Sequence, residues 1–375
     1  MCVRKPCSSE EQSKNMTDFP TPTNQITPIF GFGYMRSGTT LIFNILKLHP
    51  EIYTGAQEPK IIDSLHSIKN EYPDLSIENI LLKYIAYLAN VARFGSPIKH
   101  LGEPLIENEL FTESDLTLLH PLAINLEYIQ VMNLVYNLLA SKSQKKYWYI
   151  KSQVAFFADI HQWMPNALFI EIIRDPRDVI ASKKKDKESV WHSTKYSVDK
   201  RKVKYLEKTY DPIWDSLSWK AECSAGTEII KIIPDHIFII KYEDLVRDPE
   251  TYTKDLCGFL NTKFYKRQLD VPKRNSSLWE NRPAGIGPES INKWKKILTS
   301  EEIVLCQSIS KHEMQLYFYE IKNIKPNLFK LISILLGSIA EFFARLVKRL
   351  RMNGLKFVMN IIRLYWRKFI QLIRA

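Results

Sequence analysis

Residues 33–40 have the composition of a phosphate-binding loop. They read Gly-Tyr-Met-Arg-Ser-Gly-Thr-Thr, with Gly33 and Gly38 spaced as in the loops of nucleotide triphosphatases. Glycines let backbone N–H groups converge on phosphate oxygens, and a helix that begins after the loop adds its positive end. The position after the second glycine holds Thr39 where a triphosphatase has lysine, and the basic residue stands earlier, at Arg36. The loop therefore predicts phosphate binding but gives little support for hydrolysis of a β–γ phosphate bond.

A second candidate for phosphate binding follows an apolar run at 168–173. The run ends in Arg174, and Ser182 stands eight residues later, where a helix is expected to have begun. A guanidinium at a strand end and a hydroxyl in the next helix can reach one phosphate through charge-assisted hydrogen bonds. Although Asp175 and Asp178 are near in sequence, a cation at the strand end suits an extra phosphate better than magnesium. We therefore expect no metal site.

Both candidates need alternating strands and helices to position them. Short apolar runs predict strands at 29–32, 147–150, 168–173 and 236–241. Periodic apolar patterns predict helices at 39–48, 156–164, from 177, 212–233, 249–260 and 299–317. This alternation indicates parallel strands joined by right-handed crossovers. The predicted fold class is α/β, a P-loop-like doubly wound parallel sheet flanked by helices, with a C-terminal basic amphipathic helical extension.

Residues 60–145 carry no catalytic constellation. They are predicted to be largely helical, whereas 183–212 are charged and are expected to form an irregular, mobile loop near the ligand. Trp219 and Tyr242 are interpreted as core aromatics.

Composition is that of a globular protein with a core, with 45% apolar and 25% charged residues in 375. We predict a disordered N-terminal segment at 1–25, a main domain at 26–320 and a basic tail at 321–375. The five cysteines are scattered without a C-x-x-C pair, so neither a zinc site nor a disulfide framework is indicated. Together with the lack of an apolar signal-peptide stretch, this favours a reduced, cytoplasmic setting.

Most of the net charge of +12 lies in the tail, which has twelve Lys and Arg and a single acid, Glu341. In a helix over 355–374, Lys356, Arg363, Arg367 and Arg374 would share one face opposite an apolar face. That pattern is typical of a helix lying on an anionic membrane, and its apolar face has no role on nucleic acid. Residues 331–340 are uncharged but too few to span a bilayer. We expect peripheral attachment to the inner face of a membrane; packing of the tail on the body or on a second subunit is the alternative.

The sequence resembles the sulfotransferase superfamily in these motifs. The string from Arg36 to Leu41, followed by His49 and Pro50, resembles the 5′-phosphosulfate loop of tyrosylprotein and bacterial-type members. The string from Arg174 to Ser182 resembles their 3′-phosphate element. Further segments that fit are 241–249, 275–277 and 291–294, so the resemblance covers about 28–320. Met35 stands where Pro is common, and Arg36 replaces the Lys of cytosolic members, which indicates the Arg-type group.

The resemblance implies the donor 3′-phosphoadenosine 5′-phosphosulfate (PAPS), a hydroxyl or amine acceptor, and in-line transfer without a metal. It implies donor contacts from Arg36, Ser37, Gly38, Thr39, Thr40, Arg174, Ser182 and Lys293. We expect Arg36 and the loop N–H groups to stabilise the leaving group, and Lys151 to neutralise the bridging or sulfuryl oxygens.

An acceptor hydroxyl also needs a general base. Glu58 is the candidate by similarity to bacterial-type Glu-Pro-Lys segments, although an ungapped match to the tyrosylprotein group places Gln57 there. The alternatives are His100, His120 and His192.

Two other functions remain open at this point. One is a non-catalytic nucleotide-binding or membrane-scaffold protein that retains the fold. The other is a P-loop kinase, which Thr39 disfavours. No motif in 60–145 identifies the acceptor.

Overall fold

The computed structural model describes residues 26–54, 76–94, 104–124, 126–194, 210–271, 285–344 and 347. The chain divides into two compact units. The first consists of Met1–Arg174 and Glu222–Ile291, and the second of Asp175–Ala221 and Asn292–Ala375. The predicted N-terminal segment 1–25 and the amphipathic stretch 355–374 lie outside the described residues.

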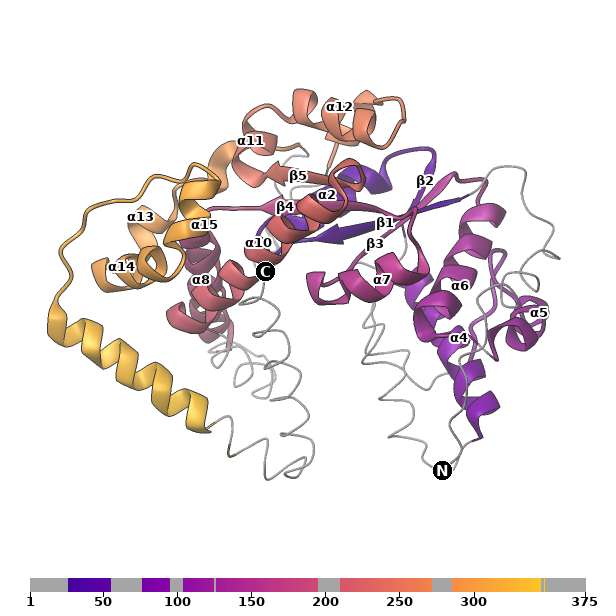
Figure 1. Ribbon diagram of the computed structural model, residues 1–375, viewed down its shortest axis with the longest axis horizontal. Coiled ribbons are helices and arrows are strands. Elements are labelled where there is room, and N and C mark those ends of the chain that lie inside the picture. The colour runs from indigo at the N-terminus through magenta and orange to yellow at the C-terminus, as the bar shows by residue number, and fades with distance from the viewer. Residues whose placement is uncertain are drawn as a thin grey trace. The chain divides into compact units, whose positions relative to one another are not determined.

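The first unit is built on a parallel five-stranded sheet, which confirms the predicted α/β class. Its strands are β1 (Thr27–Phe32), β2 (Ile52–Thr54), β3 (Tyr147–Lys151), β4 (Leu168–Ile173) and β5 (Ile237–Lys241). Their order is β2-β3-β1-β4-β5, and every neighbouring pair is parallel (Figure 1). Because helices cover both faces of such a sheet, its strands are apolar along most of their length, as in β1 and β4.

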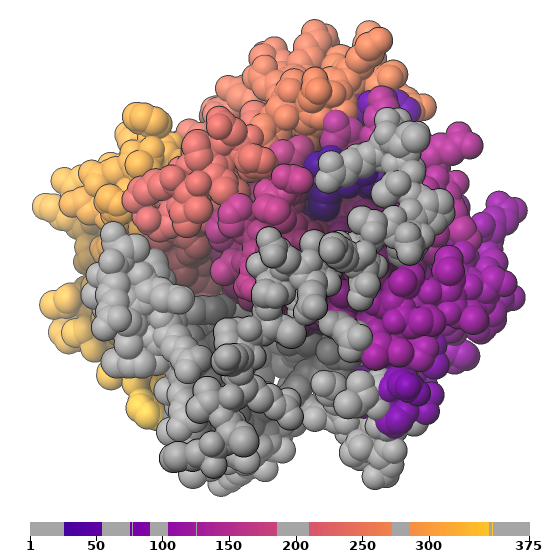
Figure 2. All heavy atoms as spheres, turned by 45° about the vertical axis from the view of Figure 1, so that its right-hand side comes forward, coloured from indigo at the N-terminus to yellow at the C-terminus, as the bar shows by residue number. Residues whose placement is uncertain are grey.

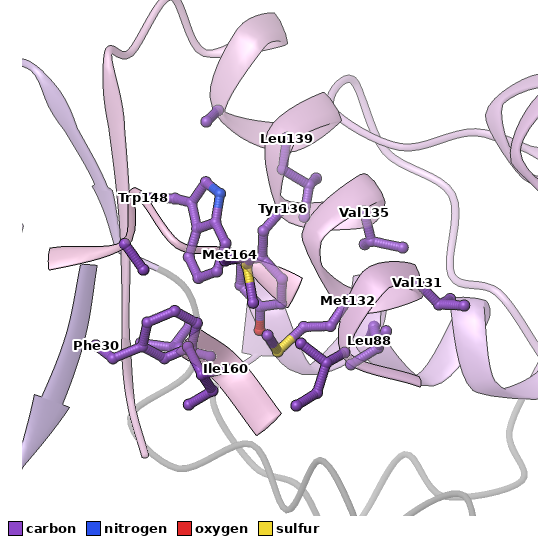
Figure 3. Close-up of a cluster of buried hydrophobic side chains, with 14 of the residues drawn as sticks. Phe30, Leu88, Val131, Met132, Val135, Tyr136, Leu139, Trp148, Ile160 and Met164 are labelled. Atoms are coloured by element: carbon purple, nitrogen blue, oxygen red, sulfur yellow. The ribbon is translucent and has the colours of Figure 1, made fainter. Parts of the chain in front are cut away.

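Helices lie on both faces of the sheet (Figure 1). One face packs against α4 (Ile77–Phe94), α5 (Glu113–Ala123), α6 (Tyr128–Lys142) and α7 (Phe157–Trp163). In this core the ring of Phe30 meets Trp148 edge-on at 5.2 Å, and residues of α4, α6 and α7 surround them (Figure 3). The opposite face packs against α2 (Thr39–Lys47), α11 (Tyr242–Arg247) and α12 (Pro249–Phe259).

The second unit is helical in its described part. It contains α8 (Pro176–Thr194), α13 (Trp294–Ile297), α14 (Ser300–Ile309), α15 (Lys311–Leu316) and a further helix over 328–344. The helix α10 (Pro212–Ile232) begins in this unit and continues in the first from Glu222. Short 3₁₀ turns are η1 (Val154–Phe156), η2 (Pro234–His236), η3 (Lys266–Leu269) and η4 (Pro288–Ser290). A small core of Ile180, Trp294, Leu298, Ile303 and Cys306 joins α8, α13 and α14.

Two expectations from the sequence differ from the structure, and one strand was not predicted. The prediction of an irregular loop from 183 is wrong up to Thr194, because α8 continues to that residue. Its charged side chains are compatible with helix because Lys183 is ion-paired with Asp215, and Lys184 with Glu302 at 2.8 Å.

The predicted helix 299–317 is two helices, α14 and α15, since Ser310 leaves the helical conformation between them. Its start is as predicted, with a capping box in which the Thr299 N–H donates to Glu302. The three-residue edge strand β2 was not predicted, because so short a run gives no periodic signal.

Candidate functional site

The loop between β1 and α2 requires its two glycines. Gly33 has φ +145°, and a Cβ there would lie 2.7 Å from the main-chain oxygen of Ile172. Gly38 has φ +108°, and a Cβ there would lie 2.6 Å from Cδ2 of Tyr242. Distances this short leave no room for a side chain, so the loop backbone lies directly against β4 and α11.

The basic residue of the loop has an unusual backbone. Arg36 has φ +70°, in the left-handed region that non-glycine residues rarely adopt, and the Ser37 N–H closes a turn on the Tyr34 oxygen at 3.0 Å. The helix α2 then begins at Thr39 with Gly38 as its N-cap. Since the first N–H groups of a helix lack partners within it, the loop ends in a ring of donors with partial positive charge.

The end of β4 is joined to this loop. Arg174 is 7% exposed; its Nη1 donates to the Arg36 main-chain oxygen at 2.9 Å and its Nη2 to the Ser290 main-chain oxygen at 2.7 Å. Its Cζ atom lies 4.4 Å from the centre of the Tyr242 ring. The structure therefore brings together Arg36 and Arg174, which lie in two separate sequence motifs.

Tyr242 packs against the core on its face of the sheet, in keeping with its interpretation as a core aromatic, and it also belongs to this site. It is partly buried, directly follows β5, and touches both Gly38 and Arg174. The signal available in the sequence was its position after a strand end, where ligand sites of parallel sheets lie. Trp219, in contrast, is fully buried, as predicted.

Further cations stand at the same edge of the sheet. Lys151 is the last residue of β3 and pairs in register with Gly31 of β1, two residues before the loop. Lys241 is the last residue of β5 and pairs with Ile173, next to Arg174. Because carboxyl ends of parallel strands share one edge, three strand ends and the loop each contribute a positive charge there.

Ser37, in the loop, is 1% exposed, and its buried hydroxyl has no hydrogen-bond partner among the described residues. A buried hydroxyl without a partner is costly. A phosphate or sulfate oxygen in the loop would relieve that cost, so the residues present fit an anionic group. Thr39 is buried and Thr40 half-buried at the start of α2.

Two predicted contacts belong to the second unit. Ser182 is half-buried on α8, and Lys293 is half-buried at the N-cap of α13. The Asp178 carboxylate of α8 accepts main-chain N–H groups on either side of Lys293, from Asn292 at 2.7 Å and Trp294 at 2.9 Å. This anchor is a feature that sequence reasoning missed.

Three of the four candidates for the general base have no described side chain. Glu58 and His100 lie outside the described residues, and His192 lies on α8 without a described side chain. His120 lies on α5, which packs against α4 and α6, and its Nε2 atom is buried without a partner among the described residues.

The described residues contain no group of three His, Cys, Asp or Glu able to hold a metal ion, and no helix that could cross a bilayer.

An unexpected carboxyl lies in the middle of β4. Glu171 is 0% exposed, and neither of its oxygens has a hydrogen-bond partner among the described residues. A Cβ at Gly226 of α10 would lie 1.6 Å from its Oε2 atom, so the carboxyl rests on the helix backbone. Burial and the nearby Glu222 carboxylate raise the pKa of Glu171 well above its ordinary value. Both effects favour the neutral, protonated form of this carboxyl.

Known proteins are similar to parts of this chain. A match to the model of the Sulfotransferase family covers residues 28–266, more than half of the chain. An uncharacterised protein of Aquifex aeolicus (strain VF5) is 24% identical over 296 residues, which are 76% of this chain and 33% of the relative. The chain thus spans about a third of the length of that curated relative.

Solved structures with a similar chain include sulfotransferases. The sulfotransferase domain of the Synechococcus PCC 7002 olefin synthase is 17% identical with a TM-score of 0.49, covering 80% of this chain and 98% of that one. A mouse sulfotransferase complexed with PAP is 12% identical with a TM-score of 0.38, covering 82% and 90%. The phosphate loop, Lys151 and Arg174 all fall within the stretch that the family model matches. The chain belongs to the sulfotransferase family.

Proposed function

We propose that this protein transfers a sulfuryl group from PAPS to a hydroxyl or amine acceptor by in-line displacement. The observation that carries the proposal is the Arg174 guanidinium bonded to a phosphate loop that has Thr39 in place of the triphosphatase lysine. That arrangement supports binding of a nucleotide with phosphate groups at two positions, without a metal. PAPS supplies the sulfuryl group when bound, and the protein supplies position and charge.

The loop holds the 5′ end of the donor in this proposal. The N–H groups of Gly38, Thr39 and Thr40 bind one anion, and the Ser37 hydroxyl gains a partner. The Arg36 guanidinium is a fork that stays charged at every physiological pH, so it stabilises the charge that develops on the leaving bisphosphate. Lys151, at the adjacent strand end, neutralises the sulfuryl oxygens.

Arg174 holds the 3′-phosphate of the donor, and we extend this role to Ser182 and Lys293 on the family resemblance. We keep Glu58 as the proposed general base. A Glu58→Gln variant that retains full activity would transfer the role to one of the histidines.

The function is tested by incubating the protein with PAPS labelled in the sulfuryl group and a host extract, and by identifying the labelled product. Arg36→Ala and Arg174→Ala should each abolish labelling. Arg247→Ala, which removes an exposed arginine of α11, is the control and should label normally. Magnesium-dependent ATP hydrolysis without affinity for adenosine 3′,5′-bisphosphate would overturn the proposal.

We also propose that the protein attaches peripherally to an anionic membrane surface on its cytoplasmic side. The helix over 328–344 packs on the second unit by one face, where the Phe342 ring stacks on Trp214 at 5.1 Å and Ser338 is buried. Its other face is exposed and apolar, with large side chains at Leu328, Phe329, Ile332, Leu336, Ile339 and Phe343. In the space-filling view, yellow atoms of this C-terminal part lie at the surface (Figure 2).

Charge favours a lipid surface over a second copy of the chain. Lys325 precedes this helix, Lys330 lies in its first turn, and both are exposed. Four more cations follow in the sequence between 345 and 351. Two such faces from two chains would bring like charges together, whereas anionic headgroups complement them.

The test is co-sedimentation of the full chain with phosphatidylglycerol and with phosphatidylcholine vesicles. The protein should bind the anionic vesicles, and a Phe329→Ser/Phe343→Ser variant should stay in solution. Phe318→Ser, which changes a phenylalanine that is 89% exposed outside this helix, should bind normally. A wild-type protein that forms dimers in light scattering and ignores both vesicles would favour the second copy.

A further inference from the structure

Asp178 is a buried carboxylate with an unusual pair of partners. It is 2% exposed in the first turn of α8, its Oδ2 accepts the Asn292 N–H at 2.7 Å, and its Oδ1 accepts the Trp294 N–H at 2.9 Å. Each oxygen of the carboxylate therefore holds one side of Lys293. Hydrogen bonds to an ionised acceptor are about twice as strong as neutral ones, so this is a firm attachment of main chain to helix.

The turn that carries Lys293 needs such an attachment. Asn292 has φ +60°, in the left-handed region, which is unfavourable for most residues with a side chain although asparagine tolerates it better than others. Trp294, two residues after Asn292, is buried against the same helix, with the Arg177 guanidinium 4.2 Å from its ring centre. Arg177 is itself ion-paired with Asp175 at 2.7 Å. The beginning of α8 thus holds the turn in two ways, by hydrogen bonds to the main chain of the turn and by contact with the Trp294 ring.

The geometry of α8 relates this turn to Ser182. Residues four apart in an α-helix lie on the same face, one turn along, and Ser182 is four residues after Asp178. The carboxylate therefore fixes the backbone of Lys293 on the face of α8 that presents Ser182. All of these residues belong to the second unit.

We propose that Asp178 is a positioning residue that keeps Lys293 beside Ser182, so that the ammonium and the hydroxyl act on the same 3′-phosphate of an adenine nucleotide. The inference rests on the proposed donor, because it assigns Lys293 and Ser182 to that phosphate. Asp178 itself does not touch the nucleotide, since both of its oxygens face main-chain N–H groups.

The substitution Asp178→Asn isolates this role. The carboxamide keeps the size of the side chain and one acceptor oxygen, but its NH₂ group then faces a second donor N–H. One of the two attachments is lost, and the turn is free to move away from Ser182. Asn292→Gly is the matched control, because it removes a side chain from the same turn, tolerates positive φ and keeps the N–H that Asp178 accepts.

The experiment measures binding of adenosine 3′,5′-bisphosphate and of adenosine 5′-phosphate to the full-length protein by calorimetry. The proteins are wild type, Asp178→Asn, Lys293→Ala, the double variant and Asn292→Gly. We expect Asp178→Asn to lower the affinity for the bisphosphate about tenfold, a loss of about 1.4 kcal/mol in binding free energy. The affinity for the monophosphate should be unchanged. The double variant should bind the bisphosphate no more weakly than Lys293→Ala does, since substitutions that affect one contact do not have additive effects. Asn292→Gly should match the wild type.

Each other outcome has a definite meaning. The positioning role is wrong if the affinity losses of Asp178→Asn and Lys293→Ala multiply in the double variant. It is also wrong if Asp178→Asn lowers the affinity for both nucleotides equally. If Lys293→Ala binds like the wild type, Lys293 is not a phosphate ligand and the inference fails while the proposed donor stands. If the wild type does not bind the bisphosphate, the donor itself is wrong. Should Asp178→Asn fail to fold in thermal melting, Asp178→Glu, which keeps the charge and shifts the turn by one methylene, takes its place in the same design.

Discussion

The Nη1 atom of Arg174 lies 2.9 Å from the main-chain oxygen of Arg36, and this bond joins residues 138 positions apart. It fixes the loop at the residue whose backbone is in the left-handed region. The same guanidinium reaches Ser290 and lies over the Tyr242 ring. Arg174 is therefore a structural part of the phosphate loop as well as its proposed partner for a second phosphate.

Replacing Arg174 by lysine should damage binding although the charge is retained. An ammonium cannot direct two hydrogen bonds at the Arg36 and Ser290 oxygens from one planar group. We expect affinity for adenosine 3′,5′-bisphosphate to fall at least tenfold, and the free energy of unfolding to fall by about 1–3 kcal/mol because buried acceptors lose their donors. Calorimetry and urea unfolding measure both, and Arg247→Lys on the surface of α11 is the control. Equal affinity in the two variants would contradict this account.

Gly38→Ala should abolish activity. The new Cβ would lie 2.6 Å from the Tyr242 ring at a φ of +108°, so the loop and the start of α2 must shift. Gly258→Ala provides the comparison, because nothing lies within 4 Å of a Cβ there and the residue is in α12. That change should stabilise the protein by about 0.5–1 kcal/mol. Activity assays and thermal unfolding of the two variants test the contrast, which would fail if both alanines were equally tolerated.

Much of this site could be predicted from the sequence, and the reasons differ by residue. Arg36 and Arg174 were found because a strand, a loop and a helix leave a local pattern that needs no knowledge of distant contacts. Tyr242 and Asp178 were missed because their roles depend on partners far along the chain, Gly38 and the Asn292–Trp294 turn. Lys183 and Lys184 were misread as loop, since the carboxylates that neutralise them come from elements more than thirty positions away.

Glu171 should make stability depend on pH. Its pKa in the folded protein lies well above 4.5, the ordinary value that it regains on unfolding. The stability that it contributes is therefore complete below pH 4.5 and declines as pH rises towards the folded pKa, by up to about 1.4 kcal/mol per pH unit. Glu171→Gln removes this titration. The free energy of unfolding of the variant should therefore rise relative to that of the wild type between pH 5 and pH 8. Urea unfolding at the two pH values measures the gain.

The Glu222→Gln variant separates the two causes of that shift. Removing the neighbouring negative charge lowers the pKa of Glu171 but leaves its burial intact, so the pH dependence should shrink without disappearing. Unfolding free energies of the wild type and Glu171→Gln that stay parallel from pH 5 to 8 would show that Glu171 is ionised in the fold.

Lys151→Ala should reduce turnover far more than nucleotide binding. Lys151 ends β3 opposite Gly31, at the sheet edge where the loop begins, and we propose that it acts on the sulfuryl oxygens, which the product adenosine 3′,5′-bisphosphate lacks. Removing one group that stabilises transition-state charge lowers kcat by about 10²–10³. Affinity for the bisphosphate should change less than about fivefold, because that ligand keeps its contacts with Arg36 and Arg174. Lys231→Ala, at an exposed lysine of α10, should leave both quantities unchanged. A Lys151→Ala variant that loses bisphosphate affinity in proportion to kcat would instead make Lys151 a ligand of the nucleotide phosphates.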